Sequence, residues 1–171
     1  MQIRFDKIGV EPSSWEETPT IDVEALGRSE LVEVEEVDWQ GQIRAEGSGF
    51  PLAARASYKQ TVACVRCLGP IAQPVSTDLQ LLVINRPAES SEGEVELSVE
   101  DLEILCWPEE VLDTTTILHE LLQLNVPMRA LCKEDCLGLC QICGSNRNES
   151  TCDCRTTPVD PRWEVLRGMS E

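Results

Sequence analysis

Nine cysteines are the residues of this chain whose type and spacing point most directly to chemistry. Cys64 and Cys67 form a pair, Cys106 stands alone, and the other six fall within 23 residues: Cys132, Cys136, Cys140, Cys143, Cys152 and Cys154. The N-terminus has no basic stretch followed by an apolar one, so it is not typical of a signal peptide. We therefore expect a reducing compartment, where cysteines bind metals more often than they form disulfides.

The spacing of these cysteines is typical of structural zinc sites. Zinc takes four thiolates in a tetrahedron at about 2.3 Å, and two cysteines separated by two residues in a tight turn can both face one ion. Backbone N–H groups in such a turn donate hydrogen bonds to the sulfurs and offset part of their charge. Because Cys64-Val65-Arg66-Cys67 and Cys140-Gln141-Ile142-Cys143 have this form, we predict one or two structural zinc ions.

Two pairings of the cysteines are compatible with this spacing. In the local scheme, a single ion is held by Cys132, Cys136, Cys140 and Cys143. In the bridging scheme, one ion is held by Cys64, Cys67, Cys132 and Cys136, and a second by Cys140, Cys143, Cys152 and Cys154. The bridging scheme is favoured because it leaves over only Cys106, whose place between Leu105 and Trp107 is typical of a buried apolar residue. The local scheme leaves thiol pairs that are prone to oxidation.

Three other uses of cysteine compete with structural zinc. A thioredoxin-like motif lies at a helix N-terminus after a strand, whereas Cys64 and Cys67 are expected between two strands. An iron–sulfur cluster also takes four cysteines, and spacing alone does not distinguish it from zinc. A catalytic zinc keeps an open position and usually a nearby base, but the chain has a single histidine, His119. We therefore predict a structural role for the cysteines, with a thiol-redox or metal-handling protein as the alternative.

The clearest predicted element is a strand over residues 52–64. Its even positions are apolar except for Gln60, and its odd positions from Arg55 to Thr61 are polar. This alternation predicts an antiparallel strand with one buried face. After Gly69-Pro70, the run Leu79–Ile84, which is apolar except for Gln80, predicts a second strand that is buried on both faces. Short strands are also predicted at 1–9, 31–37 and 41–47, and a loop with one short helical turn at 11–28.

One helix is predicted after the sheet. Asp113 is a plausible N-cap, and Pro127 should end the helix near Asn125. Four apolar residues recur at helical spacing and should face the core: Ile117, Leu118, Leu121 and Leu122. His119 lies on the same helix, where a lone histidine is more often a packing or surface residue than a metal ligand.

Together these elements predict an α+β fold, built mainly on an antiparallel sheet or partly open barrel, with a packed helix and a zinc-bound C-terminal segment. Residues 1–128 should form the β-rich core, and residues 129–171 the cysteine-rich segment with a short helix from Asp160. Residues 87–103 are expected to be an acidic surface loop with one possible strand at 94–99. The sequence has no run of about 18 apolar residues, so no membrane span is expected.

The charge of the chain is strongly negative but uneven. There are 31 acidic and 14 basic residues, for a net charge of −17, so most of the surface should repel nucleic acid. Residues 44–86 are the exception, with five basic and two acidic residues. This basic island is either a set of solvated strand faces or a binding face, whose candidate RNA contacts would be Arg55, Lys59 and Arg66.

The order of these motifs resembles the YceD family, the large ribosomal RNA subunit accumulation proteins of bacteria and plastids. The resemblance covers roughly residues 30–168. It rests on the Cys64–Leu68 motif, Pro127 before Leu131-Cys132, the run from Cys136 to Gly144, Asn146 and Asn148, and Asp160-Pro161-Arg162-Trp163. Some members of that family lack the last cysteine group, which fits the bridging scheme.

The resemblance implies a non-enzymatic, zinc-binding factor for the accumulation or maturation of large-subunit (23S) ribosomal RNA, and hence for ribosome biogenesis. The implied partners are ribosomal RNA, large-subunit ribosomal proteins or assembly factors, with no membrane and no small-molecule substrate. The expected location is the cytoplasm, or the plastid stroma for an organellar member.

Overall fold

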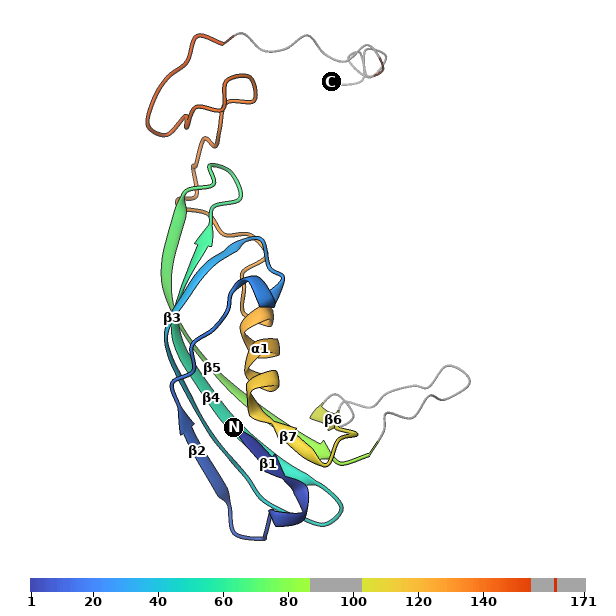
Figure 1. Cartoon of the computed structure of the whole chain (residues 1–171). Helices are drawn as coiled ribbons and strands as arrows, with labels where there is room; N and C mark the ends of the chain where they lie inside the picture. Colours follow the sequence, from blue (N-terminus) through green and yellow to red (C-terminus); the bar gives the residue numbers. More distant parts are fainter. Residues whose placement is uncertain (87–102, 155–161, 163–171) are drawn as a thin grey trace.

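A strongly curved, mainly antiparallel sheet wraps around one helix (Figure 1). The computed structural model describes residues 1–86, 103–154 and 162. Its strands are β1 (Gln2–Arg4), β2 (Ser13–Glu17), β3 (Leu31–Ile43), β4 (Phe50–Ala63), β5 (Pro70–Ile84), β6 (Ile104–Cys106) and β7 (Val111–Asp113). Five of them form the main sheet in the order β2-β3-β4-β5-β6, in which only β6 pairs in parallel. The other two, β1 and β7, form a small antiparallel pair.

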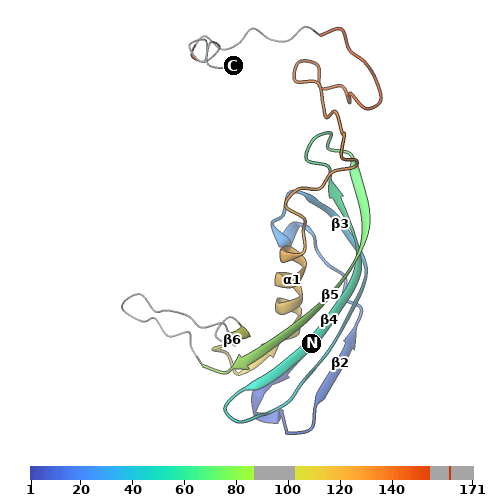
Figure 2. The same ribbon diagram turned by 180° about the vertical axis from the view of Figure 1, so that it is seen from behind.

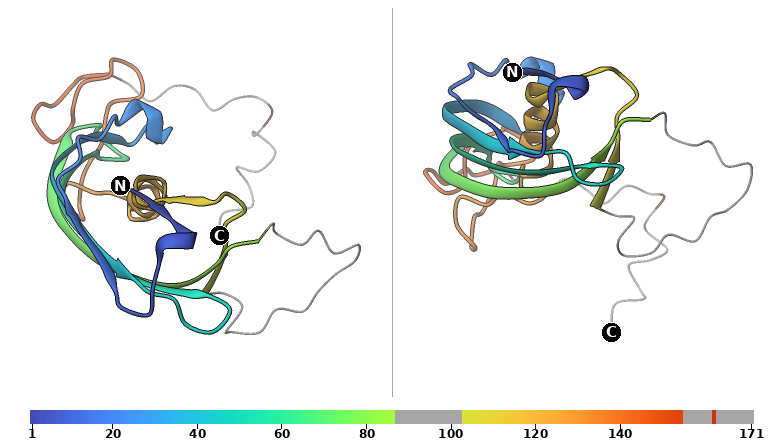
Figure 3. Two further views of the ribbon diagram at one scale, coloured as in Figure 1. Left: turned by 60° about the horizontal axis from the view of Figure 1, so that its bottom comes forward. Right: turned by 90° about the horizontal axis from the view of Figure 1, so that it is seen from below.

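The helix α1 (Thr114–Leu124) lies in the concave side of the sheet (Figure 3). Its predicted N-cap is confirmed, because Oδ1 of Asp113 accepts a hydrogen bond from the Thr115 N–H at 2.9 Å. The four predicted core residues, Ile117, Leu118, Leu121 and Leu122, are buried. Two short 3-10 helices, Phe5–Lys7 and Glu24–Leu26, complete the helical elements of the described chain.

Strand β4 is the centre of the core and follows the predicted alternation. Its even-numbered side chains from Leu52 to Val62 are buried against the helix side, and Cys64 continues the row. The exception in the pattern, Gln60, is also buried at 1% exposure. Its Nε2 lies 3.5 Å from the carbonyl oxygen of Asn125 just after the helix. The polar side chain therefore contacts the helix end instead of breaking the strand.

Strand β3 is one long strand where two short ones, 31–37 and 41–47, were predicted. Its pairing with β4 shifts register between Glu35 and Asp38, and Glu36 has a positive φ of 52°. Such a bulge adds one residue and reverses which parity faces the core. Val34 and Val37 can therefore both face inward. Because the alternation changes parity at the bulge, the sequence pattern predicted two strands instead of one.

Strand β2 lies within residues 11–28, where a loop with one short helical turn was predicted. The 3-10 helix Glu24–Leu26 supplies such a turn, but the strand was not predicted. Its anchor is Trp15, which is buried and packs against Trp39 with 5.8 Å between the ring centroids. Trp15 pairs with Gly41 on β3, and a Cβ on Gly41 would overlap the indole ring. A single buried tryptophan in five residues gives too short an alternation to be recognised as a strand.

Strand β5 is less buried than predicted. Of the run Leu79–Ile84, only Val83 is fully buried, so the prediction of burial on both faces is wrong. The reason is its position near the edge of the sheet, where β6 pairs only with Leu82–Ile84. Cys106, predicted to be a buried residue, is partly exposed because it ends this short edge strand.

The described part of the sheet is open, with β2 and β6 at its two ends, and does not close into a barrel. The cysteine-rich segment lies beyond one end of the sheet, past the turn between β4 and β5 (Figures 1 and 2). The possible strand at 94–99 and, apart from Arg162, the helix predicted from Asp160 lie outside the described residues. No helix in the described ranges is long and apolar enough to cross a membrane.

Candidate metal centres

Eight cysteine sulfurs gather into two groups of four, as the bridging scheme predicts. The first centre comprises Cys64, Cys67, Cys132 and Cys136, and the second comprises Cys140, Cys143, Cys152 and Cys154. Within each group all sulfurs lie within 4.8 Å of one another. Four sulfurs placed tetrahedrally at 2.3 Å from one zinc ion would be separated by ~3.8 Å. Each group therefore has nearly the size that one ion requires.

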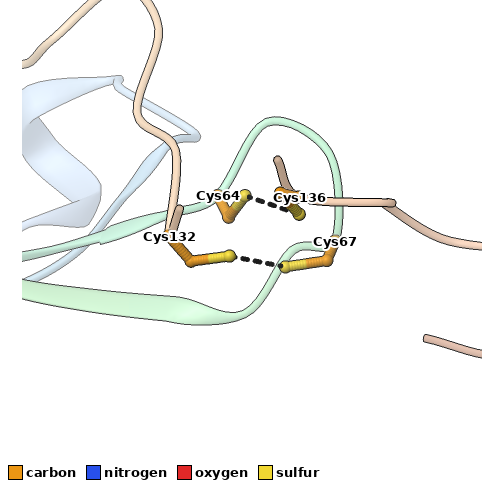
Figure 4. A group of neighbouring side chains, drawn as sticks. All are labelled: Cys64, Cys67, Cys132 and Cys136. Atoms are coloured by element: carbon orange, nitrogen blue, oxygen red, sulfur yellow. Dashed lines mark hydrogen bonds between the residues drawn. The ribbon is translucent and has the colours of Figure 1, made fainter. Parts of the chain in front are cut away.

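The sulfurs of the first centre come from two segments that are far apart in the sequence (Figure 4). Sγ of Cys64 lies 3.9 Å from Sγ of Cys136, and Sγ of Cys67 lies 3.6 Å from Sγ of Cys132. Cys64, Cys67 and Cys136 are at most 8% exposed. Apolar side chains of Ile71, Leu131 and Leu139 pack around them. Each pair therefore joins the sheet to the C-terminal segment in a mostly dry environment.

The turn after β4 positions Cys64 and Cys67. The Cys64 N–H donates to the Gly69 carbonyl, and the Leu68 N–H donates to the Cys64 carbonyl, both at 2.9 Å. Leu68 adopts a left-handed conformation with φ of 59°. The turn thus lies between two strands, as predicted, and does not have the helix N-terminus of a thioredoxin-like motif.

Backbone hydrogen bonds fasten the C-terminal segment to this turn. The Val65 N–H donates to Ala130 at 3.0 Å, and the Leu139 N–H donates to Arg66 at 3.1 Å. Gly138 has φ of 71°, and a Cβ there would lie 2.9 Å from the Arg66 carbonyl oxygen. Only glycine fits this close approach without strain. The two segments are therefore joined by backbone contacts as well as by their sulfurs.

Two side chains beside the first centre were not identified as site residues by spacing. Nδ2 of Asn148 donates to Sγ of Cys136 at 3.3 Å, and Nη1 of Arg66 donates to the Cys136 carbonyl at 2.8 Å. Asn148 belongs to the residues that carry the family resemblance, and Arg66 lies in the Cys64–Leu68 motif and was predicted as an RNA contact. Side chains that hydrogen-bond to metal-binding cysteines have no fixed sequence spacing from those cysteines. Their position within the cysteine motifs was therefore the only sequence feature that could have identified them.

The second centre is built within one short segment and is more exposed. The Cys140 N–H donates to Ser145 at 2.8 Å, and the Gly144 N–H donates to Cys140 at 2.9 Å. Oγ of Ser145 lies 3.1 Å from Sγ of Cys143. Cys143 and Cys154 are exposed, whereas Cys140 and Cys152 are partly buried. A tight turn therefore presents one pair of sulfurs, and the chain returns to supply the other.

The thiols of the first centre differ in acidity. Burial raises the pKa of Cys64, but hydrogen bonds from the backbone at Cys67, Cys132 and Arg66 outweigh this effect and lower it to about 6. The contact with the neighbouring Cys136 sulfur raises the pKa of Cys132 to about 12. Because like charges at this distance repel, some thiols ionise while others hold their protons. A divalent cation would favour the thiolate form of all four.

The second centre shows the same division. Hydrogen bonds from the side chain and backbone of Ser145 lower the pKa of Cys143 to about 6. The contact with Cys143 in turn raises the pKa of Cys154 to about 12. Both groups therefore combine acidic thiols with partners that only a cation would deprotonate near neutral pH. This donor set, four soft sulfurs without oxygen or nitrogen, suits zinc or an iron–sulfur cluster.

The three candidate RNA contacts do not form one free basic face. Arg55 donates to both carboxylate oxygens of Asp78, at 2.6 and 3.0 Å, and this hydrogen-bonded pairing lowers the pKa of Asp78. Nζ of Lys59 donates to Glu36 at 2.6 Å. Arg55 and Lys59 lie on β4, whereas Arg66 lies in the turn of the first centre. His119 and Cys106 belong to neither group of four.

Comparison with known proteins places the chain in a protein family. A family model described as "Large ribosomal RNA subunit accumulation protein YceD" matches residues 52–170. A chloroplastic YCED homolog 1 of Arabidopsis thaliana, named as a large ribosomal RNA subunit accumulation protein, is 26% identical over 132 residues. That alignment covers 65% of this chain and 41% of the plant protein.

Two further relatives extend the comparison. The homolog of the same name from Zea mays is 22% identical, over 75% of this chain and 50% of the relative. The chain thus spans half or less of the length of these plant proteins. A Mycobacterium tuberculosis protein whose name assigns no function is 24% identical, over 99% of this chain and 81% of its own length. No solved structure matches the chain significantly.

Proposed function

Because the chain belongs to the YceD family of large ribosomal RNA subunit accumulation proteins, we propose that it supports the accumulation or maturation of large-subunit (23S) ribosomal RNA without catalysing a reaction. The family match carries this proposal, since it spans nearly all of β4, the helix and both cysteine groups. Its partners would be ribosomal RNA, large-subunit proteins or assembly factors. It would act where that subunit is assembled, in a bacterial cytoplasm or a plastid stroma.

The metal part of the proposal is that each group of four cysteines binds one structural zinc ion. Four thiolates fill the tetrahedral shell of zinc and leave no open position for a substrate or water. The N–H and side-chain donors beside the sulfurs support this assignment, because such donors stabilise bound thiolates. Structural zinc contributes on the order of 10–16 kcal/mol in peptide models, so it would hold the C-terminal segment against the sheet.

A direct RNA contact through Arg55, Lys59 and Arg66 stays part of the proposal. Arg55 and Lys59 would have to exchange Asp78 and Glu36 for phosphate groups. Both ion pairs are exposed, and exposed pairs contribute only about 0–1 kcal/mol, so such an exchange is energetically accessible. Substituting Arg55→Glu and Lys59→Glu together should lower rRNA-related function and leave the fold intact. Full function in this folded variant would show that the surface around Arg55 and Lys59 does not bind RNA.

The function is tested by the ratio of 23S to 16S ribosomal RNA in cells that lack the protein. We expect a lower ratio, restored by the unchanged chain. The double variant Cys64→Ser/Cys67→Ser should fail to restore it, because the first centre would lose half of its ligands. The control Cys106→Ser removes a cysteine outside both groups and should restore it fully. An unchanged ratio in the absence of the protein would show that the proposed function is wrong.

A further inference from the structure

Strand β5 presents an open edge over part of its length. It extends from Pro70 to Ile84, but β6 pairs only with its last three residues, Leu82–Ile84. Pro74 marks the other limit of the open stretch, because proline has no N–H to donate. Residues 75–81 therefore form a free strand edge of ~24 Å among the described residues.

Whether a residue of β5 has an odd or an even number decides on which side of the strand its backbone N–H and C=O groups point. The carbonyl of Ile84 accepts the Trp107 N–H on the β6 side at 2.9 Å. N–H and C=O of one residue in a strand point to the same side, and the side alternates along the strand. Since the pairing of β4 with β5 shows no register shift, the even-numbered residues of β5 point away from β4.

Two bonds on β4 confirm this parity independently. The Pro51 carbonyl accepts from the Arg44 N–H, and the Ala63 N–H donates to Glu30, so odd-numbered residues of β4 point toward the β3 side. Its even-numbered residues must then face the odd-numbered residues of β5. On the open stretch, the backbone N–H and C=O groups of Ser76, Asp78 and Gln80 thus face outward. They have no hydrogen-bond partner in the described residues.

An apolar row runs beside this free ladder. Val75 and Leu79, on the helix side of β5, are only partly buried although they pack against the core. An additional strand beside β5 would extend the sheet and cover them. The edge can therefore form backbone hydrogen bonds with an added strand. Every second side chain of that strand would then pack against the apolar row.

We propose that this edge binds an extended, basic polypeptide segment of another protein by adding it to the sheet as a further strand. The ladder selects a polypeptide, since backbone N–H and C=O groups in strand register pair with another backbone. The net charge of −17 favours basic side chains between the apolar ones. The positive balance of residues 44–86 does not oppose them at this edge, because Arg55 and Lys59 on the neighbouring strand are already paired with acidic residues. The same charge disfavours RNA and a second copy of this chain, because both would add negative charge.

The test is the binding of a fluorescent peptide of about eight alternating valine and lysine residues to the full chain. A peptide with the same composition, but all lysines before all valines, measures non-specific attraction. We expect the alternating peptide to bind at least about tenfold more tightly. Equal binding of the two peptides would overturn the proposal.

The variants Ser76→Pro and Gln80→Pro, combined in one chain, remove two outward N–H groups at positions like that of Pro74. The matched variant Ser76→Ala/Gln80→Ala keeps both N–H groups. We expect the proline variant to lose about tenfold in affinity and the alanine variant to keep it. Equal affinity would overturn the proposal, as would a wild-type dimer that the proline variant dissolves.

Amide hydrogen exchange of the unchanged protein decides the case even where the proline variant does not fold. The N–H groups of Ser76, Asp78 and Gln80 should exchange rapidly in the free protein and slowly with the alternating peptide bound. Binding without new protection at these three amides would overturn the proposal. The measurement needs neither metal nor ribosomal RNA, so its failure is distinct from failure of the proposed function.

Discussion

Asn148 connects the two groups of cysteines. Its Nδ2 donates to Sγ of Cys136 in the first centre at 3.3 Å, and its Oδ1 accepts the Leu137 N–H at 2.9 Å. In the chain it lies between Cys143 and Cys152 of the second centre. One side chain thus holds the loop of the second centre against a ligand of the first.

Replacing Asn148 by alanine should weaken zinc binding at the first centre by about tenfold, because residues that hold metal ligands typically contribute this much. Competition with a chromophoric chelator measures the affinity. The control is Ser150→Ala, since within the described residues Oγ of Ser150 donates its hydrogen bond to the Asn146 carbonyl, at 3.4 Å, and not to a cysteine. If Asn148→Ala releases zinc no more readily than this control, its bond to Cys136 does not support the metal.

The acidity of the thiols predicts how zinc binding depends on pH. At pH 7 Cys64, with a pKa of about 6, is mostly a thiolate, whereas Cys132, with a pKa of about 12, is protonated. Zinc binding at the first centre should therefore release at least one proton but fewer than the four its thiols could supply. Because protons compete with zinc for sulfur, the apparent affinity should rise with pH.

Calorimetric titration of zinc into metal-free protein, in two buffers of different ionisation enthalpy, measures this release. Comparing the unchanged chain with Cys140→Ser/Cys143→Ser assigns the protons to the first centre. Release of all four protons would contradict the account, because it would mean that the thiols keep ordinary pKa values and that the centre is not preformed.

At the scale of the elements, β4 and α1 could be predicted because their apolar residues recur at the period of a strand and of a helix, respectively. The alternation along β4 and the stripe from Ile117 to Leu122 both agree with the observed burial. Strand β3 could not be predicted as one element, since the bulge at Glu36 reverses its parity. Burial of β5 depends on its neighbours in the sheet, and no local pattern specifies them.

The loop around Gly138 joins the C-terminal segment to the β4–β5 turn. Gly138→Ala should destabilise this junction, because a left-handed conformation costs a residue with a Cβ about 1–2 kcal/mol and the new Cβ would press on the Arg66 carbonyl. Faster zinc loss to a chelator and a lower melting temperature should both be seen.

Gly144→Ala is the matched control for this prediction. Gly144 has a similar φ of 72°, but a Cβ there would meet nothing within 4 Å. It should therefore cost only the conformational part, about 1–2 kcal/mol. Equal effects of the two substitutions would show that the contact with Arg66 does not hold the junction.

For the whole molecule, the spacing of the cysteines was sufficient to propose both groups of four, because pairs separated by short turns meet in few ways. Their surroundings were not predictable. The ion pair of Arg55 with Asp78 depends on the register that places these residues opposite each other. The basic island of the sequence is an exposed surface in the structure, but its Arg55 and Lys59 are already paired with acidic residues.

Joining the sheet to the cysteine-rich segment is the main consequence of the first centre for the molecule. Its ligands come from the β4–β5 turn and from residues after the helix, 65 positions apart for Cys67 and Cys132. An ion bound there would close this long loop, and the second centre would order the chain that follows. The metal would then determine the shape of the surface offered to partners.

The most direct test of this account is elemental analysis, with counting of reactive thiols, on protein purified without added metal. Two four-thiolate centres predict about two zinc ions per chain and about one reactive thiol, Cys106. One zinc ion with several reactive thiols would contradict the bridging arrangement. Iron with visible absorbance would contradict the assignment to zinc.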